Sequence, residues 1–364
     1  MILKLSVVIL NYNVRYFLEL CLQSVEAALQ DIASEIIVID NNSQDGSCEM
    51  VVSKFPSVVL IKNSTNVGFS KANNQAVQRA SGEYVCILNP DTVIAEDSFD
   101  KLLDFADKKS NLGIIGCRLI DGSGAFLPES KRNIPHLKIA IQKALGLSKP
   151  YYATHLKEHS IGKVDVLVGA FMLLKRRLYN SLKGFDEDYF MYGEDIDLSY
   201  KSLKEGYDNY YYGELSAIHY KGESTVKDLG YLRRFYGAMK IFYSKHFQKN
   251  RLFDFLIYLG IKCMVLLPSS KHRPSRLVSN SLLITEKSHP GIIRKLNPKI
   301  SSSLDKLAPN TQLIFDAAYL SFKTIIDQLQ NFNNHDCVFK IQPKNCSYIV
   351  GSSSADTQGE IIQF

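Results

Sequence analysis

The richest group of chemically active side chains lies between Gly184 and Asp197, where carboxylates alternate with aromatic residues. Within it, Glu194 and Asp195 directly follow Gly193 at the predicted start of a helix, where the helix dipole favours a carboxylate. A carboxylate held between aromatic walls can bind hydroxyl groups and accept a proton from one of them. The alternative is a surface helix whose first turn is capped by acids, and the pattern alone leaves both open.

Polar residues also stand where apolar, strand-like runs end: Asn11, Asn13, Asp40, Asp91 and His219. A carboxylate such as Asp40 can accept hydrogen bonds from a base or a ribose. Asp91 could help to hold a hard cation, and a neutral imidazole such as that of His219 could be a metal ligand. Each also has an ordinary structural explanation, as a helix cap, a turn residue or a core histidine.

The elements that must position these residues alternate along the first part of the chain. Strands alternating with helices predict a mostly parallel sheet with helices on both faces. Right-handed crossovers place the carboxyl ends of such strands at one edge, where sheets of this kind bind ligands. The polar residues should therefore meet there. The predicted strands are 5–10, 35–39, 58–61 and 84–88, and the predicted helices are 16–29, 47–54 and 70–80.

The middle of the chain is less regular. The segment 121–150 is rich in Gly, Ser, Pro and Lys, which indicates a long loop, and loops of that length are usually functional or disordered. We expect a strand over 164–174 and a helix over 194–205. Gly68, just before the predicted helix 70–80, permits close backbone approach at a helix start, although an ordinary turn is the alternative.

Composition limits the protein class. The 364 residues allow about two domains. A net charge of +6 is too small to indicate a nucleic-acid partner. Seven scattered cysteines without a CxxC spacing favour reduced thiols in the cytosol. The apolar stretch 255–270 is interrupted by Lys262 and is shorter than the roughly 20 residues that a membrane-spanning helix needs.

The segment 221–276 carries twelve Lys or Arg and three acids, interleaved with aromatic residues. It could be a helical region that contacts an anionic membrane surface or a lipid-linked partner, or simply a solvated helical pair. After residue 290, the pattern of strand, helix and strand predicts a small α/β unit.

Taken together, the ordered motifs resemble family 2 glycosyltransferases with the GT-A fold, and most of all the rhamnosyltransferase-like bacterial branch. The matching stretches are SVVILNYN, IIVIDNNSQDGS, NVGFSKANNQAV, GEYVCILNPDTVI, GAFMLLKRR, GFDEDYFMYGEDIDLSYK and HYKGEST. The resemblance implies that Asp195, in the pair with Glu194, is the general base. Asn89-Pro90-Asp91 departs from the family's DxD motif and keeps only its last carboxylate.

The resemblance also implies the binding residues. For the donor these are Asn11, Asn13, Asp40, Gly68, Asn73 and Asp91; for the acceptor they are Gly169, Ala170 and Tyr192; for a divalent cation, Mg²⁺ or Mn²⁺, they are Asp91 and His219.

The expected fold is α/β: a Rossmann-like GT-A nucleotide-sugar-binding domain over 1–225, with a mixed, mostly parallel sheet and helices on both faces. A basic aromatic helical region over 226–290 and a small α/β C-terminal appendage over 291–364 follow. The expected activity is inverting, metal-dependent transfer of a sugar, rhamnose by the resemblance, from a nucleotide-diphosphate sugar to a glycan or lipid-linked saccharide. We expect a cytoplasmic protein, peripheral at the inner face of the cell membrane, with no nucleic-acid partner. A catalytically weak nucleotide-sugar-binding or scaffolding protein is the alternative.

Overall fold

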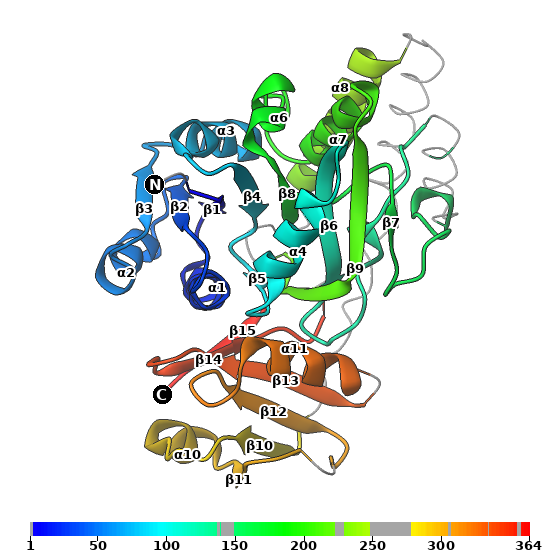
Figure 1. Cartoon of the computed structure of the whole chain (residues 1–364). Helices are drawn as coiled ribbons and strands as arrows, with labels where there is room; N and C mark the ends of the chain where they lie inside the picture. Colours follow the sequence, from blue (N-terminus) through cyan, green and yellow to red (C-terminus); the bar gives the residue numbers. More distant parts are fainter. Residues whose placement is uncertain are drawn as a thin grey trace.

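The computed structural model divides the chain into two α/β units, each built on its own sheet (Figure 1). It describes residues 3–136, 139, 149–222, 229–247, 278–304, 307–333, 335–354 and 358–364.

The larger unit contains a nine-stranded sheet in the order β3-β2-β1-β4-β8-β6-β9-β5, with β7 paired to β9. β1 pairs in parallel with β2 and β4, whereas β8 runs antiparallel between β4 and β6. The sheet is thus mixed and mostly parallel, as expected. Its strands are β1 (Leu5–Asn11), β2 (Ser34–Asp40), β3 (Val59–Lys62), β4 (Tyr84–Leu88), β5 (Thr92–Val93), β6 (Leu112–Ile120), β7 (Ile161–Lys163), β8 (Phe171–Lys175) and β9 (Asp208–His219).

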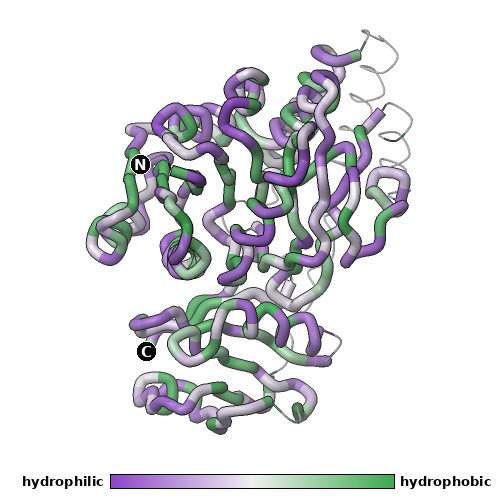
Figure 2. Tube along the Cα trace, in the orientation of Figure 1, coloured by the Kyte–Doolittle hydropathy of each residue, from purple (hydrophilic) through white to green (hydrophobic). Residues whose placement is uncertain are grey.

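Helices cover both faces of this sheet. α1 (Arg15–Ala28), α2 (Ser47–Lys54) and α4 (Ser98–Asp107) pack on one face. α3 (Phe69–Arg79), α6 (Arg176–Ser181) and α7 (Glu194–Lys204) pack on the other. Alternate residues of a single strand enter the two cores: Val7 packs with α1, and Val8 packs with α3. This two-sided burial explains why the strands are continuous apolar runs (Figure 2).

Helix α8 (Leu229–His246) lies against the larger unit. Its Ala238 and Phe242 are buried in one cluster with Tyr189 and Ile196. This part of the expected helical region therefore turns its aromatic side chains inward. The rest of that region as far as residue 277 lies outside the described residues. No helix in the described part of the chain is both long and apolar enough to cross a membrane.

The second unit is a six-stranded sheet in the order β11-β10-β12-β13-β14-β15, with helices α10 (Pro290–Leu296) and α11 (Phe322–Asn331). It begins at β10 and not at residue 291, because Leu283 and Ile284 are buried in the sheet between β11 and β12. The expected domain boundary is corrected accordingly. The strands are β10 (Asn280–Ile284), β11 (Lys299–Ser301), β12 (Thr311–Asp316), β13 (Cys337–Gln342), β14 (Tyr348–Gly351) and β15 (Glu360–Gln363).

Candidate active site

A cavity of about 360 Å³ opens where β1, β4 and β9 end and α7 begins. The elements of the larger sheet therefore bring together residues that lie far apart in the sequence, at the edge where such sheets bind ligands. Most of the residues singled out in the sequence line it: Gly68, Asp91, Gly169, Ala170, Tyr192, Glu194, Asp195 and His219.

Four expected donor residues lie outside the lining: Asn11, Asn13, Asp40 and Asn73. Asp40 is only 2% exposed, and its carboxylate accepts hydrogen bonds from Asn11 Nδ2 at 2.7 Å and from the Ser43 amide at 2.8 Å. Asn13 is exposed, and its Oδ1 accepts a hydrogen bond from the Gln44 amide at 2.8 Å. These side chains stabilise the loops after β1 and β2, whose neighbouring residues Tyr12 and Asn41 line the cavity.

Gly68 is required by packing at the start of α3. Its φ is +88°, and a Cβ there would lie 2.6 Å from the Phe190 carbonyl oxygen. The Phe69 amide donates to that same carbonyl at 2.7 Å. Asn73, also expected at the donor, is buried in α3 and donates to the Phe69 carbonyl at 3.0 Å. Gly68 thus lets the loop that precedes α7 dock against the α3 side of the cavity.

Asp91 and His219 are brought together by the short ladder between β5 and β9, in which Thr92 pairs with His219. His219 Nε2 lies 3.5 Å from Asp91 Oδ1 and 3.2 Å from Asn89 Nδ2. A carboxylate oxygen and an imidazole nitrogen this close can both reach one divalent cation. Within the described residues no group of three or more His, Cys, Asp or Glu side chains that could hold a metal ion occurs. Cation binding stays a prediction.

Glu194 and Asp195 lie in the first turn of α7, after Gly193 in a left-handed conformation with φ +84°. Asp195 Oδ2 accepts hydrogen bonds from Arg132 Nη2 at 2.6 Å and from the Gly169 amide at 3.1 Å. Burial, and then the Asp195 carboxylate beside it, raise the pKa of Glu194 to about 8. Glu194 Oε2 is buried and has no hydrogen-bond partner among the described residues.

Asp197 points away from this pair, as the helical period predicts. It is 1% exposed and contacts His246 of α8 at 2.6 Å and Lys201 at 3.0 Å. Burial alone would raise the pKa of Asp197, but hydrogen bonding to His246 and the charge of Lys201 hold it below its ordinary value.

Sequence reasoning missed Arg132, which is 7% exposed and lines the cavity. Besides Asp195, its guanidinium donates to the Leu167 carbonyl at 2.6 Å and to the Tyr151 hydroxyl at 3.3 Å. The sequence pointed to Arg132 only indirectly, because it lies in the long, irregular segment after β6 and loops of that length are often functional.

Lys221 and Glu129 form an ion pair on the cavity wall. Burial alone would raise the pKa of Glu129, but Lys221 holds it below its ordinary value. Lys221 lies in the stretch HYKGEST, which carries part of the family resemblance, but the sequence did not indicate a role for it.

Comparison with known proteins identifies the family of the chain. A family model described as Glycosyl transferase family 2 matches residues 6–182. N-acetylglucosaminyl-diphospho-decaprenol L-rhamnosyltransferase of Mycobacterium tuberculosis is 30% identical over 241 residues, which cover 62% of this chain and 78% of that protein. Rhamnosyltransferase WbbL of Escherichia coli is 30% identical over 164 residues, 42% of this chain and 61% of that protein.

A solved structure, mannosyltransferase PcManGT from Pyrobaculum calidifontis in complex with GDP-Man and Mn²⁺, has a TM-score of 0.49 and 18% identity. That match covers 71% of this chain and 69% of the other. The expected resemblance and fold class are confirmed: the chain belongs to glycosyl transferase family 2 and carries the GT-A fold.

Proposed function

We propose that this protein is an inverting glycosyltransferase that transfers a sugar from a nucleoside-diphosphate sugar to a hydroxyl group of a lipid-linked glycan precursor. The observation that carries the proposal is that Asp91 and His219 line the same cavity as Glu194 and Asp195. The first pair suits a cation beside the donor diphosphate, and the second pair suits removal of the acceptor proton.

The nucleoside of the donor would lie against the loops that follow β1 and β2. Asn41, which lines the cavity, donates to the Gly68 carbonyl at 3.1 Å and is thereby held in place. Tyr12, 37% exposed, offers a ring face to a base. Asp40 and Asn11 support these two residues from beneath, which is the role we propose for them.

A divalent cation, Mg²⁺ or Mn²⁺, would neutralise the negative charge that develops on the departing diphosphate. Asp91 and His219 would hold it together with donor phosphates and water, because Mg²⁺ is commonly bound by one or two carboxylates and substrate phosphates. Lys221, on the same wall, would add a second positive charge near the phosphates.

The acceptor hydroxyl needs a base as it attacks. Burial raises the pKa of Glu194 to about 8, and we assign the role of base to Asp195, which the Arg132 guanidinium holds in place. Arg132 and the Gly169 amide bind Asp195 Oδ2, and Oδ1 accepts a hydrogen bond from the Ile196 amide. The hydroxyl oxygen bonds to the anomeric carbon, its proton passes to Asp195, and the diphosphate leaves with the bonding electron pair. One such displacement inverts the anomeric centre.

The names of the relatives favour rhamnose as the sugar and a lipid-diphosphate saccharide as the acceptor. Aromatic residues on the cavity wall, Tyr151, Tyr192 and Phe190, suit the apolar face of a saccharide ring. An acceptor on a lipid would place the protein at the cytoplasmic face of a membrane, where the basic segment 221–276 would meet anionic lipid.

The proposal is tested by measuring thermal stabilisation with a panel of nucleoside diphosphates and Mn²⁺, followed by transfer from the matching rhamnose donor to N-acetylglucosaminyl-diphospho-polyprenol. A nucleotide at 100 times its dissociation constant should stabilise the protein by about 2.7 kcal/mol. Asp195→Asn should bind the nucleotide and fail to transfer. If no nucleoside diphosphate stabilises the wild-type protein, the proposal is wrong. Nucleotide binding without transfer to any saccharide would favour the scaffolding alternative.

A further inference from the structure

The second α/β unit shares a hydrophobic core with the catalytic unit. Val93 of β5 and Ile218 of β9 are fully buried in one cluster with Phe315, Ile325 and Phe339 of the second unit. Domains that move independently usually meet through polar interfaces, whereas a large apolar interface holds them together. The two units therefore form one packed body, with α11 lying below β5 and β9 in Figure 1.

Glu96, three residues after β5, links the units through the start of α11. Its carboxylate accepts hydrogen bonds from the Phe322 amide at 2.7 Å and the Lys323 amide at 2.9 Å. The first amides of a helix have no partner within the helix and carry its positive dipole end. A carboxylate of the catalytic unit therefore occupies the anion-binding end of this helix.

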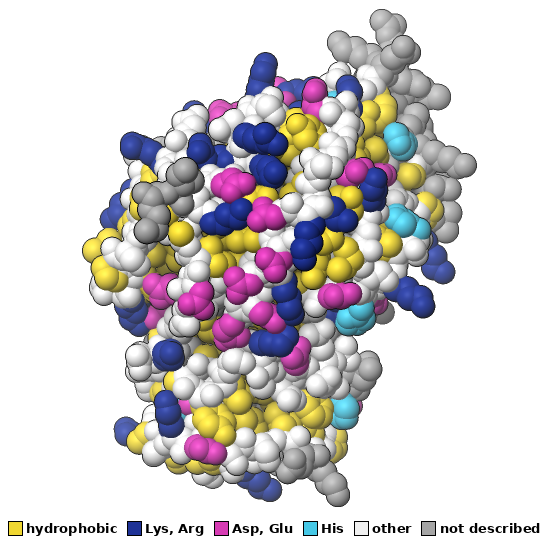
Figure 3. Space-filling view, in the orientation of Figure 1, with side chains coloured by type: hydrophobic (Ala, Val, Ile, Leu, Met, Phe, Trp, Pro, Cys, Tyr) yellow, Lys and Arg dark blue, Asp and Glu magenta, His cyan; other side chains and the backbone are white. Residues whose placement is uncertain are grey.

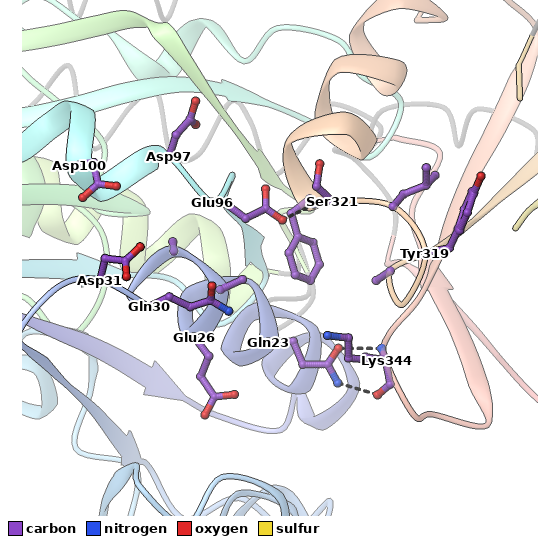
Figure 4. Close-up of a pocket in the computed structure, with 15 residues that line it drawn as sticks. Gln23, Glu26, Gln30, Asp31, Glu96, Asp97, Asp100, Tyr319, Ser321 and Lys344 are labelled. Atoms are coloured by element: carbon purple, nitrogen blue, oxygen red, sulfur yellow. Dashed lines mark hydrogen bonds between the residues drawn. The ribbon is translucent and has the colours of Figure 1, made fainter. Parts of the chain in front are cut away.

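Figure 4 shows Glu96 pointing toward the loop at Ser321, and both residues line a cavity of about 600 Å³ between the units. Gln23 and Lys344 also line this cavity and are joined by two hydrogen bonds. Gln23 Nε2 donates to the Lys344 carbonyl at 3.0 Å, and Gln23 Oε1 accepts from the Lys344 amide at 2.8 Å. Acidic side chains gather on this face over α1 and α4 (Figure 3). One of these acids, Asp97, pairs with Lys323 of the second unit at 3.3 Å, and Glu96 beside it binds the first amides of α11.

At the carboxyl edge of the second sheet, the acid that ends β12 is already bonded within the described residues. Asp316, at the end of β12, is 1% exposed. Its carboxylate is bonded to Thr285 Oγ1, His289 Nε2 and the Ala318 amide, each at 2.8 Å. The Asp316 carboxylate and the first amides of α11 therefore both have partners within the protein.

The second unit packs against β5 and β9, the pair of strands next to the candidate cation ligands Asp91 and His219. Asp91 directly precedes β5, His219 ends β9, and the Tyr220 amide donates to the Asp91 carbonyl at 3.0 Å. Because Val93 and Ile218 of this ladder are buried in the shared core, a shift of the second unit must move the ladder.

We propose that the second α/β unit is a brace, which holds the β5–β9 ladder and thereby the Asp91–His219 spacing needed to bind the cation and donor diphosphate. The statement that this spacing is needed to bind the cation and the donor diphosphate rests on the proposed function. The statement that the second unit holds the ladder in place does not. Glu96 is in these terms a positioning residue, since it acts on the site through the ladder.

A substitution at Gly122 should disturb the contact between the two units most directly. A Cβ at this position would lie 2.3 Å from the Ser352 carbonyl oxygen in the second unit and 3.0 Å from a ring carbon of Tyr220. Gly122→Ala should therefore wedge the units apart. Gly237→Ala is the matched control, because Gly237 is exposed in α8 and a Cβ there meets nothing within 4 Å. Glu96→Gln is a milder variant that removes the charge without adding volume.

Two measurements on the full-length variants, made well below their melting temperatures, test the brace. Hydrogen exchange over 89–96 and 216–222 should speed up about tenfold in Gly122→Ala, with exchange over 34–40 unchanged, because local opening follows local packing. The dissociation constant of the nucleoside diphosphate with Mn²⁺ should rise at least about tenfold, since small displacements at a site are costly. Glu96→Gln should move both readouts in the same direction by less, and Gly237→Ala should move neither.

Unchanged exchange in a folded Gly122→Ala protein would overturn the brace, and so would faster exchange with an unchanged dissociation constant. If Gly122→Ala does not fold, Glu96→Gln decides between the same outcomes. If the wild-type protein binds no nucleoside diphosphate, the proposed function fails, and the exchange measurement alone still decides whether the second unit braces the ladder.

Discussion

Replacing Glu194 by Gln should make the protein's stability less sensitive to alkaline pH. Burial and the neighbouring Asp195 raise the pKa of Glu194 to about 8, so the folded state holds this proton more tightly than the unfolded chain does. The stability that this proton contributes is fully present below the unfolded pKa, is lost as the pH rises toward 8, and is absent above it. Gln keeps the size of the side chain and never ionises.

The magnitude follows from the two pKa values. With about 4.3 for the unfolded chain and about 8 for the folded one, wild-type stability should fall by about 3 kcal/mol relative to Glu194→Gln between about pH 5.5 and pH 8.5. In a chain of this size, that difference corresponds to a relative shift in melting temperature of roughly 5 °C.

The assay is thermal unfolding of both proteins across that pH range, without ligand. Glu205→Gln is the control, because Glu205 lies exposed just beyond the other end of α7. Its melting temperature should follow that of the wild type at every pH. A difference between Glu194→Gln and wild type that stays constant with pH would show that Glu194 is not a protonated acid at neutral pH, and the division of roles with Asp195 would have to be abandoned.

The remaining predictions concern catalysis, the cation and the membrane. Asp195→Asn should lower turnover at least about a hundredfold while nucleotide still binds, since general-base assistance contributes that much; Asp197→Asn should keep most activity, and near-normal turnover of Asp195→Asn would refute the choice of base. Asp91→Ala should abolish transfer and His219→Ala should weaken it; full activity of Asp91→Ala in EDTA would remove the cation from the mechanism. The segment 221–276 should give salt-sensitive binding to anionic vesicles, at up to about 1 kcal/mol per basic residue; protein that stays in the supernatant at low salt in a sedimentation assay would contradict it.

The larger sheet was predictable because its strands are buried on both faces. The runs ending near Asn11, Asp40 and Asp91 are continuous and apolar, and each is followed by polar residues. In the short strand β10, by contrast, the first residues are exposed or half-buried and only the last two are buried. Its sequence therefore lacks the regular hydrophobic pattern that predicts a strand. The sequence therefore placed the start of the second unit too late. Its packing against β5 and β9 could not be predicted, because the local hydrophobic pattern does not report contacts between distant segments.

The site was predicted in part for a similar reason. Asp91, His219 and Asp195 follow strands or begin a helix, so topology alone places them at one edge. Arg132 lies in irregular chain, where no period fixes the direction of a side chain. Asp40 was expected to contact ligand, yet its hydrogen bonds to Asn11 and Ser43 use its carboxylate beneath the cavity surface. Sequence position specifies the edge of a sheet, but burial decides which side chains reach the cavity.

The first turn of α7 shows how three neighbouring acids acquire different properties. Asp195 is paired with Arg132, and Asp197 is paired with Lys201 and His246. Glu194 is buried and forms no ion pair of its own among the described residues, and burial together with the Asp195 carboxylate raises its pKa to about 8. Adjacent carboxylates whose surroundings differ this strongly divide acid and base roles between them. Burial raises the pKa of Glu194, whereas Asp195 is held by the Arg132 guanidinium and the Gly169 amide, and this difference is why we propose Asp195 as the base.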